Sequence, residues 1–190
     1  MRESGVDDAD LTRWALEARR GDRAAAARLI EHTQRDLLRF LTHLVDAREA
    51  EDLAQETWLR AMKALPQFEA RASARTWLLS IARRVAADHV RTVVRRPRVS
   101  AHEDWQSAAE AALGREGSRV DEVVVLRRLL QDLPADRREA FVATQIAGLS
   151  YAEAAAVCDC PVGTIRSRVA RARDDLMSAL GQAPRHLRAV

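Results

Sequence analysis

The stretch that decides the C-terminal part of the fold is SYAEAAAVCDCPVGTIRSRVARAR, residues 150–173. Ser150 stands three residues before Glu153, which predicts a capping box at the start of a short, alanine-rich helix. Asp159 lies in the following turn, and aspartate tolerates the left-handed backbone that such turns use. A second helix is expected to start near Pro161, where a missing N–H costs nothing. The stretch therefore predicts a helix-turn-helix.

The second helix of this motif has an apolar side and a basic side. Apolar residues recur at helical spacing and are expected to form its buried stripe: Ile165, Val169, Leu176 and Leu180. The residues between them include Arg166, Ser167, Arg168, Arg171 and Arg173. A helix of this kind suits the major groove of DNA. An ordinary solvated basic face is the alternative, but the agreement of cap, turn and basic helix favours DNA binding.

The composition predicts a soluble, cytoplasmic protein of one or two domains. The chain has 190 residues and a net charge of +3, and Lys63 is its only lysine. The arginine excess is explained by a GC-rich coding bias, although arginine also binds phosphates and guanine edges bidentately. No hydrophobic run is long enough to span a membrane, and residues 1–20 lack the layout of a signal peptide. Membrane insertion is therefore not expected.

Apolar residues recur with a period of about 3.6 residues along the chain, which predicts an all-α fold. Helices ahead of the helix-turn-helix are expected over residues 8–20, 22–45, 47–65, 72–94, 120–133 and 134–147. Pro66 is expected to end the third helix, Ser73 to cap the fourth, and Gly148 to stop the sixth.

The pattern fails over residues 95–119, which contain Pro97, Gly114, Gly117 and few large apolar side chains. A flexible linker is predicted there, with one weak helix near residues 105–113. The chain is therefore expected to form two helical domains, residues 1–94 and 120–190.

Charge is unevenly distributed along the first of these domains. Residues 46–56 contain five acids and one arginine, whereas residues 83–98 contain six arginines and one acid, Asp88. Each sign suits the dipole of its own helix end. A domain that faces a protein on one side and a nucleic acid on the other has the same pattern. The charges alone do not decide between these interpretations.

Three strings resemble a known family. Asp52–Phe68 (DLAQETWLRAMKALPQF) and Arg75–Arg91 (RTWLLSIARRVAADHVR) resemble region 2 of sigma factors. Leu133–Arg173, with its GLSY-x-E and PVGT-x-RSR-x-x-RAR patterns, resembles region 4. The small size and the bare linker are similar to the extracytoplasmic-function (ECF) group. The resemblance covers residues 10–180 and implies a subunit that binds core RNA polymerase and directs promoter-specific transcription initiation.

The resemblance implies a role for each matching position. Core polymerase would contact Asp52, Leu53, Gln55 and Glu56. The −10 element would contact Phe68, Arg71, Arg75, Thr76, Arg83, Arg84, His89 and Arg91. The −35 element would contact Ser150, Tyr151, Val162, Gly163, Thr164, Arg166, Ser167, Arg168, Arg171 and Arg173. Within the last set, base edges are expected to meet Arg166, Ser167 and Arg171, while the other arginines hold phosphates or neighbouring acids.

Several aromatic and sulfur side chains have a simpler interpretation as core residues. Trp58 and Trp77 lie on apolar stripes, and Phe68 after Pro66 can equally plug the core. Cys158 is expected to be a small core residue and Cys160 a partly exposed free thiol. A structural metal site needs about four ligands, and no histidine or further cysteine lies near these two in the sequence. A disulfide between cysteines separated by one residue would be strained. No metal and no cofactor are therefore expected.

The chain departs from the family pattern at some positions. Asp159 and Cys158 stand where relatives often have glycine and an aliphatic residue, and Ala154 stands where they often have isoleucine. Phe68-Glu69-Ala70-Arg71-Ala72 replaces the usual F-R-G-x-S loop. These departures leave the base preference open, especially at the −10 element. They do not change the expected fold.

Two other function classes are the alternatives to a sigma factor. A stand-alone helix-turn-helix regulator would share the C-terminal motif and bind DNA without polymerase, using its other domain for a ligand. An enzyme would need a phosphate loop, a metal cluster or a nucleophile with its base, and the sequence has none of these motifs. The partners expected are core RNA polymerase, promoter DNA and an anti-sigma factor, with no small-molecule substrate.

Overall fold

The computed structural model describes residues 6–95 and 127–182, and every regular element in these ranges is helical. The N-terminal part contains α1 (Asp8–Arg19), α2 (Arg23–Leu44), α3 (Ala47–Ala64), the 3₁₀ turn η1 (Leu65–Gln67) and α4 (Ala74–Arg95). After a helical turn at residues 127–132, the C-terminal part contains α7 (Ala135–Phe141), η2 (Val142–Ile146), α8 (Tyr151–Cys158) and α9 (Val162–Gln182). The predicted all-α class is confirmed. The predicted linker, residues 95–119, lies outside the described residues beyond Arg95.

Short polar side chains start the N-terminal helices, and the cap predicted at Ser73 is one of them. The carboxylates of Asp7, Asp22 and Asp46 accept backbone N–H groups at the starts of α1, α2 and α3. At α4, the Thr76 N–H donates to Ser73 Oγ over 3.1 Å. Each cap satisfies a donor that has no partner within its own helix.

The loop between α3 and α4 is held by aromatic packing. Pro66 lies in η1, directly after the end of α3. Phe68 is 4% exposed and its ring centroid lies 5.0 Å from that of Trp77 on α4. Both rings pack with buried residues of α1 such as Leu11 and Ala15. The core interpretation of Phe68 is therefore the one that its burial supports.

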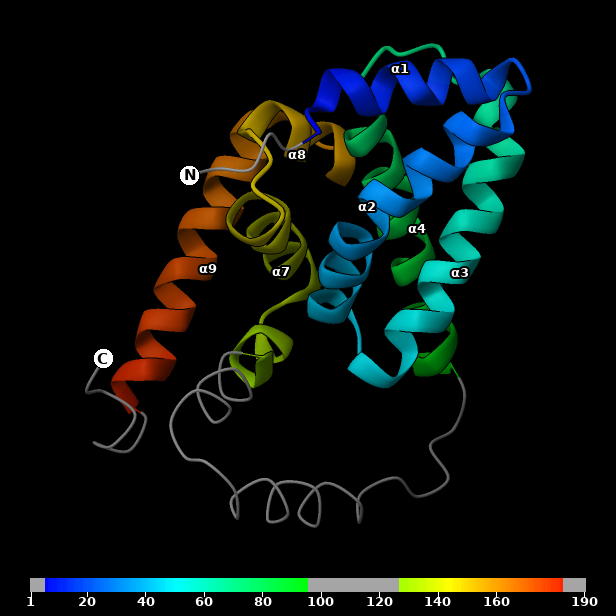
Figure 1. Cartoon of the computed structure of the whole chain (residues 1–190). Coiled ribbons are helices and arrows are strands. Elements are labelled where there is room, and N and C mark those ends of the chain that lie inside the picture. Colours follow the sequence, from blue (N-terminus) through cyan, green and yellow to red (C-terminus); the bar gives the residue numbers. More distant parts are fainter. Residues whose placement is uncertain (1–5, 96–126, 183–190) are drawn as a thin grey trace, which may run out of the picture.

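The C-terminal helices pack directly against α4. One continuous apolar cluster joins Leu78, Leu79 and Ala82 of α4 to Ala154 and Val157 of α8. Figure 1 shows α4 between α3 on one side and the α7–α8 pair on the other. Alanines on α8 allow this close approach because they place little bulk between the two backbones. The described parts thus share a core, and the domain boundaries at residues 94 and 120 stay a prediction.

Two details differ from the sequence-based expectation. The helix expected over residues 134–147 is α-helical only to Phe141 and continues as the π-helical turn η2, ending before Gly148 at φ 69°. Leu180, expected in the buried stripe of α9, is 37% exposed, so that expectation is wrong. Among the described residues, Leu130 and Leu133 pack with Ala172 and Leu176 of α9, and Leu180 is not part of this cluster. Ala172, which is fully buried, completes the stripe instead.

Candidate nucleic-acid interfaces

The helix-turn-helix forms as predicted, with each local signal in its expected place. Ser150 Oγ accepts the Glu153 N–H over 3.2 Å, and the Ser150 N–H donates to Glu153 Oε2 over 2.8 Å. The hydrogen bond from the Ser150 side chain lowers the pKa of the Glu153 carboxyl. Asp159 adopts φ 52° and ψ 52° in the turn, and its N–H donates to the carbonyl of Ala155. The cap and the turn together fix the angle at which α9 leaves α8.

The side of α9 opposite its buried stripe is a row of exposed polar groups. Ile165 and Val169 are buried, whereas Arg166, Ser167 and Arg171 are exposed. Among the described residues, Arg166 and Arg171 form no ion pair. Ser167 Oγ donates to the Thr164 carbonyl over 2.9 Å, so its hydroxyl oxygen can still accept a hydrogen bond. The predicted base-reading side chains thus lie together on one accessible face.

Two arginines of α9 are held by the chain itself. Arg168 is half-buried, and its Nε lies 3.1 Å from Asp136 Oδ2 while Nη1 lies 3.7 Å from Cys160 Sγ. Arg173 Nη2 donates to Gln145 Oε1 over 2.9 Å. Both contacts tie α9 to the preceding helices. A neighbouring acid for one of these arginines was expected from the sequence, but its identity was not.

The remaining residues predicted at the −35 element lie at the starts of α8 and α9. Tyr151 and Val162 are 38% and 37% exposed, and Gly163 is exposed. Thr164 is half-buried. The Ser150 hydroxyl is already engaged in the capping box. The start of a long helix offers free N–H groups and a positive dipole end to a phosphate.

The residues predicted at the −10 element divide into covered and accessible groups. Arg75 Nη2 donates to the Ala147 carbonyl over 2.5 Å, and its Nε donates to Asp36 Oδ2 over 3.1 Å. Arg83 Nε lies 2.9 Å from Glu139 Oε2 on α7. Both arginines therefore bind groups of the C-terminal part, and Arg75 also binds α2. No local sequence pattern could have identified their partners, because 56 residues separate Arg83 from Glu139.

Other members of the −10 set sit nearer the solvent or in a small cavity. Arg84 and Arg91 are exposed, as is Arg71, which pairs with Glu69 at 2.6 Å. His89 Nε2 lies 2.6 Å from Glu49 Oε2 on α3. Thr76 is 2% exposed. The loop and α4 border a cavity of about 290 Å³, which Ala156 of α8 also lines.

The acidic side of α3 is only partly available to a partner. Asp52 and Gln55 are exposed, whereas Leu53 is 9% exposed and belongs to the core. Glu56 Oε1 accepts a hydrogen bond from Arg60 Nε over 2.7 Å. Among the four residues predicted to contact polymerase, Asp52 and Gln55 thus present the most accessible polar groups.

Neither cysteine belongs to a metal site among the described residues, where no group of three or more potential ligands comes together. Both thiols are free, and Cys158 is buried while Cys160 is half-buried. Burial raises the pKa of the Cys158 thiol to about 12, so it stays protonated and unreactive at neutral pH.

No described helix is long and apolar enough to span a membrane.

Comparisons with known proteins agree with this geometry. The profile of Sigma-70 region 2 matches residues 29–96, and that of Sigma-70, region 4 matches residues 124–176. The chain is 48% identical over 178 residues to the ECF RNA polymerase sigma factor SigC of Mycobacterium tuberculosis, covering 94% of this chain and 95% of the relative. It is 36% identical to the RNA polymerase sigma-H factor of Pseudomonas aeruginosa, covering 85% and 89%.

Solved structures give the same result. CnrH, solved in complex with the cytosolic domain of CnrY, matches with a TM-score of 0.72 at 25% identity, covering 94% of this chain and 100% of CnrH. RpoE of Bartonella quintana, solved with the anti-sigma factor NepR, matches with a TM-score of 0.64 at 28% identity, covering 83% and 98%. The fold and its basic helix therefore define a sigma factor of the sigma-70 type. Within that class, the chain belongs to the ECF group of RNA polymerase sigma factors.

Proposed function

We propose that this ECF sigma factor binds core RNA polymerase through α3 and directs initiation through α4 and α9. The observation that most supports the assignment is the exposed arginine face of α9, set opposite a buried stripe by a capped helix-turn-helix. A stand-alone regulator would use the same motif. However, an identity of 48% over nearly the whole of a sigma factor favours polymerase-dependent action.

At the −35 element, Arg166, Ser167 and Arg171 contact base edges in the major groove. Arginine binds guanine O6 and N7 through two parallel hydrogen bonds, and each good pair discriminates by about 1–3 kcal/mol. Arg173 contributes to phosphate binding, and its contact with Gln145 keeps its guanidinium near the sugar-phosphate backbone of the DNA. The N–H groups near Gly163 bind a phosphate at the start of α9.

At the −10 element, the accessible arginines make the first contacts. Arg84 is exposed and can meet phosphates directly, whereas Arg71 and Arg91, although exposed, are paired with Glu69 and Asp88. Arg75 and Arg83 reach DNA only by exchanging their present partners, Ala147 and Glu139, for phosphates. Each exchange replaces one favourable contact with another, so we expect a smaller net gain from these two positions.

The partners named for the solved relatives suggest a further one. CnrH was solved with the cytosolic domain of CnrY, and RpoE of Bartonella quintana with the anti-sigma factor NepR. We propose that this chain also has an anti-sigma partner, that it acts in the cytoplasm, and that it has no catalytic activity of its own.

Transcription in vitro with core polymerase and a genomic promoter library, followed by sequencing of the start sites, tests the proposal. The chain should direct initiation at a defined set of promoters that core polymerase alone does not use. Asp52→Arg should weaken binding to core polymerase, because it reverses an exposed charge on the docking face. Glu31→Arg is the matched control, since Glu31 is an exposed acid on α2. Equal binding of core by Asp52→Arg and the parent would place the docking face elsewhere.

A further inference from the structure

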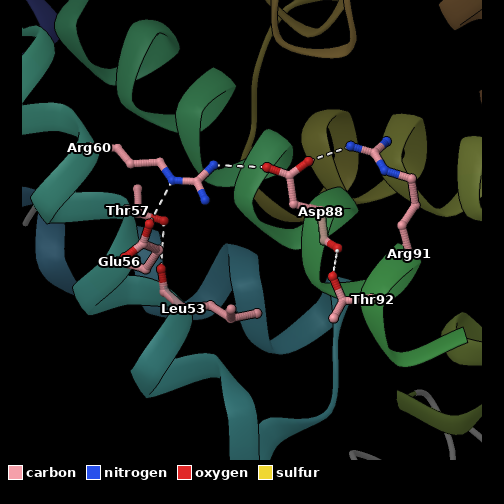
Figure 2. Close-up of polar contacts among 7 residues, drawn as sticks. All are labelled: Leu53, Glu56, Thr57, Arg60, Asp88, Arg91 and Thr92. Carbon is pink, nitrogen blue, oxygen red and sulfur yellow. Dashed lines mark hydrogen bonds and ion pairs between the residues drawn. The ribbon is translucent and has the colours of Figure 1, made fainter. Parts of the chain in front are cut away.

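A row of alternating charges crosses from α3 to α4. Glu56 Oε1 lies 2.7 Å from Arg60 Nε, and Arg60 Nη1 lies 2.9 Å from Asp88 Oδ2. Asp88 Oδ1 in turn binds Arg91 Nη2. Figure 2 shows the four side chains in this order, with Arg60 and Asp88 bridging the two helices. We call this set, Glu56, Arg60, Asp88 and Arg91, the bridging network.

The two middle members of the bridging network each serve two partners. Arg60 divides its donors between Glu56 and Asp88, and the carboxylate of Asp88 gives one oxygen to Arg60 and the other to Arg91. Hydrogen bonds from Arg60 and then Arg91 lower the pKa of Asp88, so it is ionised at neutral pH. Because a guanidinium can bind both oxygens of one carboxylate, Arg60 and Arg91 compete for Asp88.

The two ends of the network lie on surfaces with different proposed partners. Glu56 belongs to the acidic side of α3, where core polymerase is proposed to dock. Arg91 belongs to the basic end of α4, where DNA is proposed to bind. Asp88 is the single acid among the six arginines of residues 83–98, so its position beside Arg91 reduces the positive charge offered at this end.

We propose that Asp88 is a positioning residue that restrains Arg91 in the free chain. When a partner that docks on α3 binds Glu56, Arg60 loses this acceptor and binds both oxygens of Asp88. Arg91 is then free to bind DNA phosphates. The inference rests on the proposed function for the identity of the two faces. Polymerase docking and DNA binding are then coupled through two surface ion pairs. All four side chains are substantially exposed, so each step shifts affinity by only about two- to fivefold.

The first test removes the restraint. Affinity of the full chain for a short labelled duplex of arbitrary sequence is measured by fluorescence anisotropy over a series of salt concentrations. Asp88→Asn should raise the affinity by about two- to fivefold and steepen the salt dependence by about one phosphate contact. In an Arg91→Gln background the same substitution should give no more than the uniform effect of one lost negative charge.

The second test imitates the withdrawal of Glu56. Glu56→Gln keeps the shape of the side chain but weakens its hold on Arg60, so it should raise duplex affinity. Glu51→Gln is the matched control, because Glu51 is an exposed acid on the same helix and forms no ion pair within the described residues. The excess of Glu56→Gln over Glu51→Gln should disappear when Arg60→Gln or Arg91→Gln is added.

The outcomes separate the inference from a merely structural role. If Asp88→Asn lowers both the duplex affinity and the midpoint temperature of thermal unfolding, Asp88 only anchors α4 to α3 and the inference is wrong. Equal effects of Glu56→Gln and Glu51→Gln would show that the faces are not coupled. If Arg91→Gln leaves the salt dependence unchanged, Arg91 is not a DNA contact and the inference fails, whereas the proposed function stands as long as the parent directs promoter-specific initiation.

Discussion

The two basic helices of this sigma factor use the same residue type in different ways. On α9, Arg166 and Arg171 extend from the molecule with no ion pair among the described residues. On α4, Arg75 and Arg83 bind a carbonyl and a carboxylate of the C-terminal helices. Basic character in a sequence therefore shows where positive charge lies along the chain but not whether that charge is available to DNA.

The difference follows from how much of each helix is covered. α9 packs mainly against α7 and α8, so one stripe is buried and the rest of its surface is open. α4 packs against α1, α2, α3 and α8, so most of its circumference is covered. In the covered part of α4, Arg75 and Arg83 reach groups of neighbouring elements, whereas Arg84 and Arg91 stay exposed. Arginines of region 2 consequently hold the fold as well as carrying charge.

The largest expected effect concerns the core that both regions share. Leu79 is 1% exposed in the cluster that joins α4 to α8. Leu79→Ala should lower the free energy of unfolding by about 2–5 kcal/mol, because it removes buried methyl groups and leaves a cavity. Urea unfolding followed by circular dichroism measures this. Leu59→Ala, at a position that is 59% exposed, should change it by less than about 0.5 kcal/mol.

Unfolding of Leu79→Ala also tests whether the regions behave as one unit. A single transition, shifted to lower urea, is expected from a shared core. Two separate transitions, with only one of them shifted, would mean that the regions unfold independently and that the contrast between α4 and α9 belongs to two separate domains.

The next effect concerns the open helix. Arg171→Ala should reduce discrimination at one or two positions of the −35 element by about 1–3 kcal/mol without changing thermal stability. Arg173→Ala should instead weaken binding evenly across sequences and reduce the salt slope by about one contact. Binding of the full chain to a selected −35 duplex and its single-base variants measures both. An equal loss for every variant of the duplex would make Arg171 a phosphate contact.

A smaller effect compares two left-handed residues that are not glycine, one in each described part of the chain. Ala70, in the loop before α4, has φ 55°, and Asp159, in the turn before α9, has φ 52°. Ala70→Gly should raise the free energy of unfolding by up to about 1 kcal/mol, because relief of the strain exceeds the added entropy of the unfolded chain. Asp159→Gly should be closer to neutral, since aspartate tolerates this conformation. Thermal midpoints that order these variants the other way would contradict this assignment of strain.

The smallest effect is a pH dependence that originates at the end of α2. Burial, then Arg127 and Arg39, lower the pKa of His43 below 6.5. The folded state therefore prefers the neutral imidazole. Its stability should be greatest above about pH 6.5 and should fall as the pH drops below that value toward the lowered folded pKa.

Unfolding free energies about one pH unit above and below 6.5 test this prediction. His43→Gln should flatten the dependence, and His32→Gln, at an exposed site on the same helix, is the matched control. An unchanged slope in His43→Gln would assign the pH dependence to other groups.

Much of the local structure could be predicted because its causes are local. The caps at Ser73 and Ser150, the left-handed turn at Asp159 and the stop at Gly148 each depend on residues within one turn of helix. The exposed arginines of α9 followed from helical spacing alone. Leu180 was misplaced because periodicity shows which side of a helix is apolar but not where the neighbouring helix ends.

The amino-acid sequence by itself determined the helices, their caps, the helix-turn-helix and the side of α9 that faces outward. Only the tertiary structure decided that Arg75 binds Ala147, that Arg83 binds Glu139 and that Asp88 lies between Arg60 and Arg91. Helix formation depends on residues three or four positions apart, whereas these pairs depend on which helices pack side by side. Burial of the shared apolar cluster sets that packing, and the charged groups pair where it places them.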